Sequence, residues 1–357
     1  MLRASAAAAT AALALGVTGC AGTLKQHYTP AELRQELAGR PGVTGDDVVV
    51  PYELPPQVLE TARRLVDRAR SDGEKVELLV QAMFDPAVFG LDGGLTAETT
   101  TGAQALRDGR GNCVGLASVF IGLARAVGLD ASYVDASSRV SETRFGEDGS
   151  TVHLGHVSAM VNTGNERVSL DFARLGPVQW YQRLDDLEAL AHYYNNRGYE
   201  LVDRAREAGL APDWAEAQRL FKLAVVVKPG FARGWNNLGI AAARLGQRDE
   251  AMACYRKATE LAPAMAAPHA NLGAIHLQAG DLPAALAELA AAARLDPKGA
   301  HIQYSLAVVR LRSGDRDGAL EALRRTLALR RNYPGAQALL ERLSPGSPGD
   351  TGSGDGD

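Results

Sequence analysis

The sequence contains few cysteines, and their number limits what can hold the fold together. Only three cysteines occur in 357 residues, whereas a disulfide-based fold needs a denser and regularly spaced set. Cys113 and Cys254 fall in segments that we assign below to separate domains, so we do not expect them to pair. Hydrophobic residues make up 46% of the chain, and we therefore predict domains that hydrophobic cores stabilise.

The sequence also lacks an excess of either charge. Its 38 basic and 42 acidic residues give a formal net charge of -4, whereas nucleic-acid-binding domains usually carry a basic surface. Close ligand pairs such as CxxC or HExxH, which are typical of metal sites, do not occur around the chain's cysteines and histidines. The composition therefore predicts no nucleic-acid partner, no metal site and no cofactor.

The apolar run near the start is shorter than the ~20 residues that a bilayer-spanning helix needs. Arg3 precedes this Ala-rich run, and "VTGC" follows it and ends at Cys20. The arrangement resembles a bacterial lipoprotein signal with its lipobox. The resemblance implies a signal peptide over residues 1–19, a lipid on the Cys20 sulfur and a tether over 20–46. The alternative is an ordinary secretory signal with a chance cysteine.

A lipid on Cys20 would anchor the protein to a membrane of the bacterial cell envelope. If the host is Gram-negative, Ala21 after the cysteine favours the periplasmic side of the outer membrane. The last segment, residues 344–357, reads "SPGSPGDTGSGDGD". Because it is small, polar and acidic, we predict a disordered tail there.

A 34-residue period runs through the second half of the chain. Small, large and proline positions of one unit recur in the next: Trp235, Leu238, Gly239, Gly246, Ala251, Tyr255, Ala258 and Pro263 become His269, Leu272, Gly273, Gly280, Ala285, Leu289, Ala292 and Pro297. The pattern resembles tetratricopeptide repeats (TPR), which implies an all-α solenoid over 190–343. We place the repeats at 191–231, 232–265, 266–299 and 300–333, with a capping helix after them.

Asparagines recur at one register of the first helices of these repeats. Asn196, Asn237 and Asn271 occupy it, and they are candidate groove residues that would bind the backbone of an extended peptide. The alternative is a position that merely tolerates a polar residue beside a helix contact. A solenoid of this kind is expected to bind a protein or peptide through its concave groove.

The stretch "GRGNCVGLASVFIGLARAVG", residues 109–128, places a cysteine at the start of an apolar helix. Asn112 is a good N-cap, Cys113 falls in the first turn and Gly128 is a natural stop. A helix N-terminus stabilises a thiolate and offers N–H groups to an oxyanion. A small buried residue at a helix start is the alternative for Cys113.

Two strands downstream read as a β-hairpin, "HVSAMV" at 156–161 and "RVSLDF" at 167–172, with the turn "NTGN" between them. By alternation, His156 and Ser158 share one face of the first strand, and Ser169 and Asp171 share one face of the second. A histidine and an aspartate are thereby expected to meet on the more polar side of the sheet.

The candidate catalytic set is Cys113 as nucleophile, His156 as base and acid, and Asp171 as the group that orients the imidazole. His153 is a rival base, but three residues from His156 it points to the opposite face of a regular strand. Asp171 on the partner strand favours His156.

The helix stretch, "HVSAMV" and "VSLDF" resemble the transglutaminase-like core, whose arrangement is similar to that of papain. The resemblance covers about residues 60–175, and we assign the domain to 47–185. It implies an α+β core with a helix against an antiparallel sheet, and carries the catalytic roles to Cys113, His156 and Asp171. The aromatic residue that often follows the histidine is missing, and the sequence assigns no side-chain oxyanion donor; Asn112 and Gln104 are candidates, although Asn112 is more simply a helix cap.

The expected chemistry is thiolate attack on an amide through a thioester, which then goes to water or to an amine. Water would make the protein a peptidase or amidase, and an amine would make it a cross-linking enzyme. The alternative is an inactive transglutaminase-like fold whose repeats form an interaction scaffold.

Overall fold

The computed structural model describes the central part of the chain and a short segment near its start: residues 13–15, 27–45, 48–96, 98–135, 143–145, 151–153, 156–164, 166–172 and 182–343. Cys20, most of the predicted signal and the predicted tail lie outside the described residues, whereas residues 27–45 of the predicted tether are described and include a helix. Contacts divide the chain into two compact units. The first comprises Met1–Glu142 and His153–Gly234, and the second comprises Thr143–Val152 and Trp235–Asp357.

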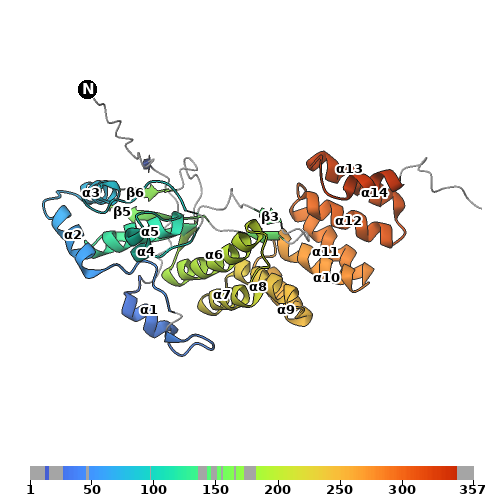
Figure 1. Cartoon of the computed structure of the whole chain (residues 1–357), viewed down its shortest axis with the longest axis horizontal. Coiled ribbons are helices and arrows are strands. Elements are labelled where there is room, and N and C mark those ends of the chain that lie inside the picture. The colour runs from blue at the N-terminus through green and yellow to red at the C-terminus, as the bar shows by residue number, and fades with distance from the viewer. Residues whose placement is uncertain are drawn as a thin grey trace, which may run out of the picture. The chain divides into compact units, whose positions relative to one another are not determined.

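The helices of the first unit include the one that the sequence predicts between the Asn112 cap and the Gly128 stop (Figure 1). They are α1 (Pro30–Leu37), α2 (Pro56–Val66), α3 (Asp72–Phe84), α4 (Gly102–Asp108), α5 (Cys113–Ala126), α6 (Asp186–Glu207) and α7 (Trp214–Val227). Their starts have physical causes: Thr29, Ser71, Thr101, Asn112 and Asp185 each accept a hydrogen bond from a backbone N–H of the first turn.

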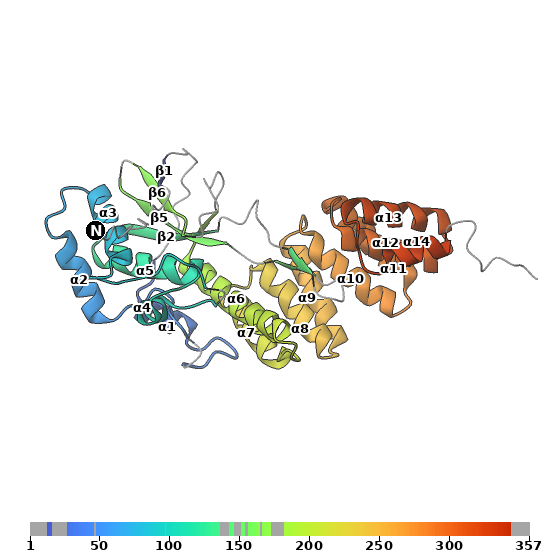
Figure 2. The same ribbon diagram turned by 45° about the horizontal axis from the view of Figure 1, so that its top comes forward.

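An antiparallel sheet of the first unit has the strand order β1-β6-β5-β2-β7, and Figure 2 shows this sheet beside α5. The strands are β1 (Leu13–Leu15), β2 (Asp130–Asp135), β5 (Val157–Asn162), β6 (Arg167–Leu170) and β7 (Gln182–Leu184). Tyr133 pairs with Ala159, and Ala159 pairs with Leu170 across the next strand. The predicted hairpin is confirmed, and its register fixes where the ends of β5 and β6 meet.

Helix α5 lies at the centre of this unit because nearly its whole length is apolar. All residues from Val114 to Ala124 are buried. Gly122 permits close approach of the chain: a Cβ there would lie 2.5 Å from the Tyr52 carbonyl oxygen. The polar Ser118 is satisfied, since its hydroxyl lies 2.8 Å from the Tyr133 hydroxyl. The helix is thus fixed against the sheet along its length.

Helices α6 and α7 share the hydrophobic core of α5. Leu190 and Tyr194 of α6, and Leu220 and Val227 of α7, belong to the same buried cluster as α5 and the sheet. The two helices also pack as a repeat-type pair, because a Cβ at Gly198 would lie 2.8 Å from the Phe221 ring. The first predicted repeat, 191–231, is longer than the 34-residue period, and the length of α6, which has 22 residues, accommodates the difference.

The second unit contains α8 (Ala232–Arg244) from Trp235 onward and the helices that follow it: α9 (Arg248–Leu261), α10 (Ala266–Gln278), α11 (Leu282–Leu295), α12 (Ala300–Arg312), α13 (Arg316–Leu329) and α14 (Ala336–Leu343). Two short strands, β3 (Thr143–Phe145) and β4 (Thr151–His153), pair with each other. The α+β core followed by an all-α repeat region confirms the predicted fold class.

The 34-residue period appears in the geometry of the helix pairs. Gly246, Gly280 and Gly314 adopt φ of 76°, 79° and 84° in the turns between paired helices, a region that favours glycine. A Cβ at Gly273 would lie 2.6 Å from Leu289 Cγ. Small residues therefore let the two helices of a repeat approach closely, as the sequence pattern predicts.

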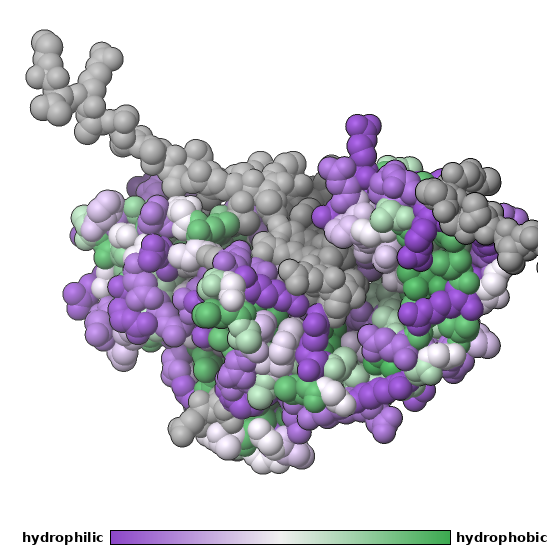
Figure 3. All heavy atoms as spheres, turned by 45° about the vertical axis from the view of Figure 1, so that its right-hand side comes forward, coloured by the Kyte–Doolittle hydropathy of each residue, from purple (hydrophilic) through white to green (hydrophobic). Residues whose placement is uncertain are grey.

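Within the described residues, no helix is both long and apolar enough to span a membrane. On the face drawn in Figure 3, hydrophilic and hydrophobic side chains are interspersed. Large hydrophobic side chains that stay partly exposed recur once per repeat, at Leu261, Leu295 and Leu329. They mark equivalent ends of the second helices.

Candidate active site

Cys113 is the first residue of α5 and is half-buried. Asn112 caps the helix, because its Oδ1 accepts a hydrogen bond from the Gly115 N–H at 3.0 Å. Its Nδ2 donates to Thr99 Oγ1 at 2.8 Å. The structure thus confirms Asn112 as the predicted cap and uses one N–H of its amide on Thr99, and an oxyanion role for the other N–H stays a prediction.

His156 directly precedes β5 and Asp171 directly follows β6. Because Ala159 pairs with Leu170, the next pair along the ladder is Ser158 with Asp171. His156 Nε2 lies 2.9 Å from Asp171 Oδ1, and the Ser158 hydroxyl donates to the same oxygen at 3.3 Å. The side chains of His156 and Asp171 are 11% and 7% exposed, so water competes little for this hydrogen bond.

The charges around His156 favour its protonated form. Burial alone would lower the pKa of this imidazole, but hydrogen bonds with Asp171 and with the Cys113 sulfur, and the charges of both groups, raise the pKa to about 10. His156 is therefore an imidazolium at neutral pH, within hydrogen-bonding reach of Cys113. Since Nε2 faces Asp171, Nδ1 is the ring nitrogen left to exchange a proton with the sulfur.

The structure thus brings together the three side chains that the sequence singled out, and their catalytic roles stay a prediction. A thiol beside an imidazolium that a carboxylate orients is suited to nucleophilic attack followed by proton donation. His153, the rival base, ends β4, and its side chain lies outside the described part. The Gln104 side-chain oxygen accepts from the Thr101 N–H at 2.9 Å in a capping box, and an oxyanion role for its NH2 group stays a prediction.

The residues that the structure describes contain no group of three or more His, Cys, Asp or Glu side chains that could hold a metal ion.

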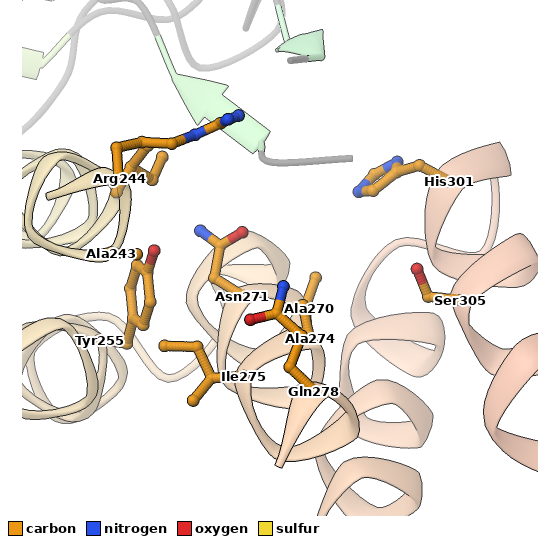
Figure 4. A pocket seen from close by; sticks show the side chains of 11 residues that line it. Ala243, Arg244, Tyr255, Ala270, Asn271, Ala274, Ile275, Gln278, His301 and Ser305 are labelled. Atoms are coloured by element: carbon orange, nitrogen blue, oxygen red, sulfur yellow. The ribbon is translucent and has the colours of Figure 1, made fainter. Parts of the chain in front are cut away.

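The repeats of the second unit line a partly open cavity of about 310 Å³. Figure 4 shows the polar side chains around it, which come from four helices: Arg244, Tyr255, Asn271, Gln278, His301 and Ser305. Its size and mixed lining fit part of a peptide side chain and backbone.

The candidate groove asparagines differ in their positions. Asn271 lines the cavity, and its Nδ2 donates to Asn236 Oδ1 at 2.9 Å. Asn237 is 1% exposed and Asn196, in the first unit, is 6% exposed. Sequence reasoning missed Asn236, because it lies 35 residues from Asn271 and outside the repeat register.

Sequence reasoning also missed Thr99 and Glu200, which lie behind the Asn112 cap. The Thr99 N–H donates to Glu200 at 2.8 Å. The two residues are 101 positions apart and belong to no recognisable motif, so only the tertiary structure reveals them.

Comparison with protein families finds two kinds of match in this chain. The model of the transglutaminase-like superfamily matches residues 59–171. Two tetratricopeptide repeat models match residues 232–264 and 276–343. No curated protein matches the chain significantly in sequence.

Several solved structures resemble the repeat part. A MamA protein is 22% identical, with a TM-score of 0.36, over 42% of this chain and 80% of that one. The pilF protein of Pseudomonas aeruginosa is 20% identical, with a TM-score of 0.40, over 44% and 68%. YrrB, described as a TPR protein with an unusual peptide-binding site, is 23% identical, with a TM-score of 0.35, over 43% and 77%.

Proposed function

The chain carries a transglutaminase-like domain followed by tetratricopeptide repeats, and from this we propose that it is a cysteine-dependent acyl-transfer enzyme of the bacterial cell envelope whose repeats recruit a protein or peptide. The observation that carries the proposal is the contact set of Cys113, His156 and Asp171. Cys113 begins a capped helix, His156 lies within hydrogen-bonding reach of its sulfur, and His156 Nε2 lies 2.9 Å from an oxygen of the buried Asp171.

The proposed reaction begins when the Cys113 thiolate attacks the carbonyl carbon of an amide. The C–N bond breaks, the leaving amine takes a proton from His156, and a thioester on Cys113 remains. His156 then accepts a proton from the water or amine that attacks the thioester carbonyl; the C–S bond breaks, the acid or new amide leaves, and the Cys113 thiolate is restored beside the protonated imidazole. We expect the N–H groups at the start of α5 that the Asn112 cap does not use to stabilise the oxyanion of both steps.

Labelling with an electrophile tests the chemistry. We expect an electrophilic amide analogue to modify the wild-type chain at Cys113, and neither Cys113→Ala nor His156→Ala to be labelled at the wild-type rate. Cys254→Ala is the matched control, because Cys254 is 4% exposed and burial raises the pKa of its thiol to about 12. Equal labelling of wild type and Cys113→Ala would leave the interaction scaffold as the better function.

The acceptor is tested separately. Incubation with a peptide amide and a fluorescent primary amine distinguishes hydrolysis from amine transfer, because only transfer incorporates the fluorophore. Hydrolysis and amine transfer would both proceed through the thioester on Cys113, so this assay identifies only the acyl acceptor.

The envelope anchor rests on the sequence "VTGC" ending at Cys20. We expect metabolic labelling with an alkyne fatty acid to modify the wild-type chain and not Cys20→Ser. Labelling that persists in Cys20→Ser would contradict a lipid at this residue.

A further inference from the structure

A chain of hydrogen bonds connects α6 with the N-terminus of α5. The Glu200 carboxylate accepts from the Thr99 N–H at 2.8 Å and also from the Thr99 hydroxyl. That hydroxyl accepts from Asn112 Nδ2 at 2.8 Å, and Asn112 Oδ1 accepts from the Gly115 N–H. Every donor in the chain has its acceptor, and the chain ends in the first turn of the helix that Cys113 begins.

This chain lies in a poorly hydrated part of the first unit. Thr99 is 1% exposed and the Glu200 side chain is 12% exposed. Burial raises the pKa of Glu200, while the hydrogen bonds from Thr99 act in the opposite direction. Buried hydrogen bonds to a charged group are strong, and losing one partner leaves the others unsatisfied. Removing Glu200 is therefore expected to disturb Thr99 and, through it, Asn112.

Helix α6 also holds the other end of α5. Arg125, in the last turn of α5, donates to both oxygens of Asp186 at 2.9 and 2.7 Å, and Asp186 is 2% exposed. The helical rise separates Asn112 from Arg125 by about 20 Å, and it separates Asp186 from Glu200 by about 20 Å as well. The spacing on α6 therefore matches the length of α5.

We propose that Glu200 is a positioning residue for Cys113, which acts through Thr99 on the Asn112 cap; the role rests on the proposed acyl-transfer function. With Glu200 in place, the Thr99 hydroxyl points its lone pair at Asn112 Nδ2. The Asn112 oxygen then stays on the Gly115 N–H, and the first turn holds the sulfur against His156. Without Glu200 the Thr99 hydroxyl rotates freely. The Asn112 side chain then occupies several rotamers, and only one of them caps the helix.

The test measures the rate at which iodoacetamide alkylates Cys113 in the full-length chain at pH 6, with the modified peptide identified by mass spectrometry. We expect Glu200→Ala to slow alkylation about fivefold. The loss of one helix cap costs about 1 kcal/mol, which corresponds to this factor. Glu200→Gln keeps an acceptor oxygen for Thr99, so its rate should stay within about twofold of wild type. The melting temperature of each variant is measured as well, and the rates are compared well below it, so that global unfolding does not contribute to alkylation.

Two further variants locate the effect. Thr99→Val should slow alkylation as much as Glu200→Ala, and the double variant should be no slower, because both break one chain. Glu98→Ala is the matched control: it removes ion pairs with Arg197 and Arg204 beside the chain, and it should alkylate at the wild-type rate.

The outcomes separate this role from the proposed function. A wild-type Cys113 that reacts no faster than a thiol in a short peptide contradicts the acyl-transfer function, and this role of Glu200 with it. A fast wild type with an equally fast Glu200→Ala, or a Glu98→Ala variant that is slowed as much, overturns the role of Glu200 alone.

Discussion

The protonation of His156 makes the stability of the first unit depend on pH with a definite sign. The pKa of His156 is about 10 in the folded protein, against a usual value of 6.5. A pKa that is raised on folding gives stability that is complete below about pH 6.5 and is lost as pH rises through the folded value. The His156 contribution should therefore fall between pH 6.5 and 10.

The size of the effect follows from the two pKa values. Their difference corresponds to at most about 5 kcal/mol of unfolding free energy at low pH. Between pH 7 and pH 9 the same relation gives a loss of about 2.5 kcal/mol. Because both Asp171 and the Cys113 sulfur raise the pKa, Cys113→Ser should make this loss smaller without abolishing it.

The assay compares the unfolding free energy of wild type and His156→Gln at each pH, so that groups common to both cancel. Urea titration with pulsed hydrogen exchange, read on peptides from α5, reports the first unit separately from the repeats. A difference between the two proteins that stays constant from pH 7 to 9, or that grows, would refute the proposed imidazolium.

Three other changes test the packing and the site. Asp171→Asn should lower the pKa of His156, measured by NMR titration, and should slow Cys113 alkylation; Ser158→Ala, which loses only a 3.3 Å hydrogen bond, should change both less. Gly115→Ala places a Cβ 2.1 Å from Thr100 Oγ1, so it should cost more than about 1 kcal/mol in thermal unfolding, and Thr100→Ala in the same chain should restore part of the loss; no recovery would contradict this contact as the cause. Gly273→Ala, which approaches Leu289 at 2.6 Å, should destabilise the second unit by about 1–3 kcal/mol, and an unchanged urea midpoint would contradict close packing there.

Local sequence patterns predicted the parts of the site that local rules determine. The cap preference of asparagine located the start of α5, and strand alternation put Ser158 and Asp171 on one face. The register of β5 and β6 confirms that placement. Because a hairpin brings its two strands together through a short turn, the pairing of His156 with Asp171 required no knowledge of distant contacts.

The contacts that the sequence did not reveal are those between distant segments. Strand β7 has three residues, which is too few for an alternation to show, and Glu200 reaches Thr99 across 101 positions. The 34-residue pattern also assigns α6 by its resemblance to other repeats. It contains no information on the second surface of α6, which packs into the core of α5.

Helix α6 belongs both to the first repeat and to the core around α5, because it uses one surface for each. With Gly198 against Phe221, α6 forms a repeat-type pair with α7. With Asp186 and Glu200, it holds both ends of the helix that Cys113 begins. A fragment that ended at residue 185 would contain Cys113, His156 and Asp171 but would lack both contacts and the buried side chains of α6. The first helix pair is therefore part of the unit that builds the site, and the repeat pattern alone does not mark where that unit ends.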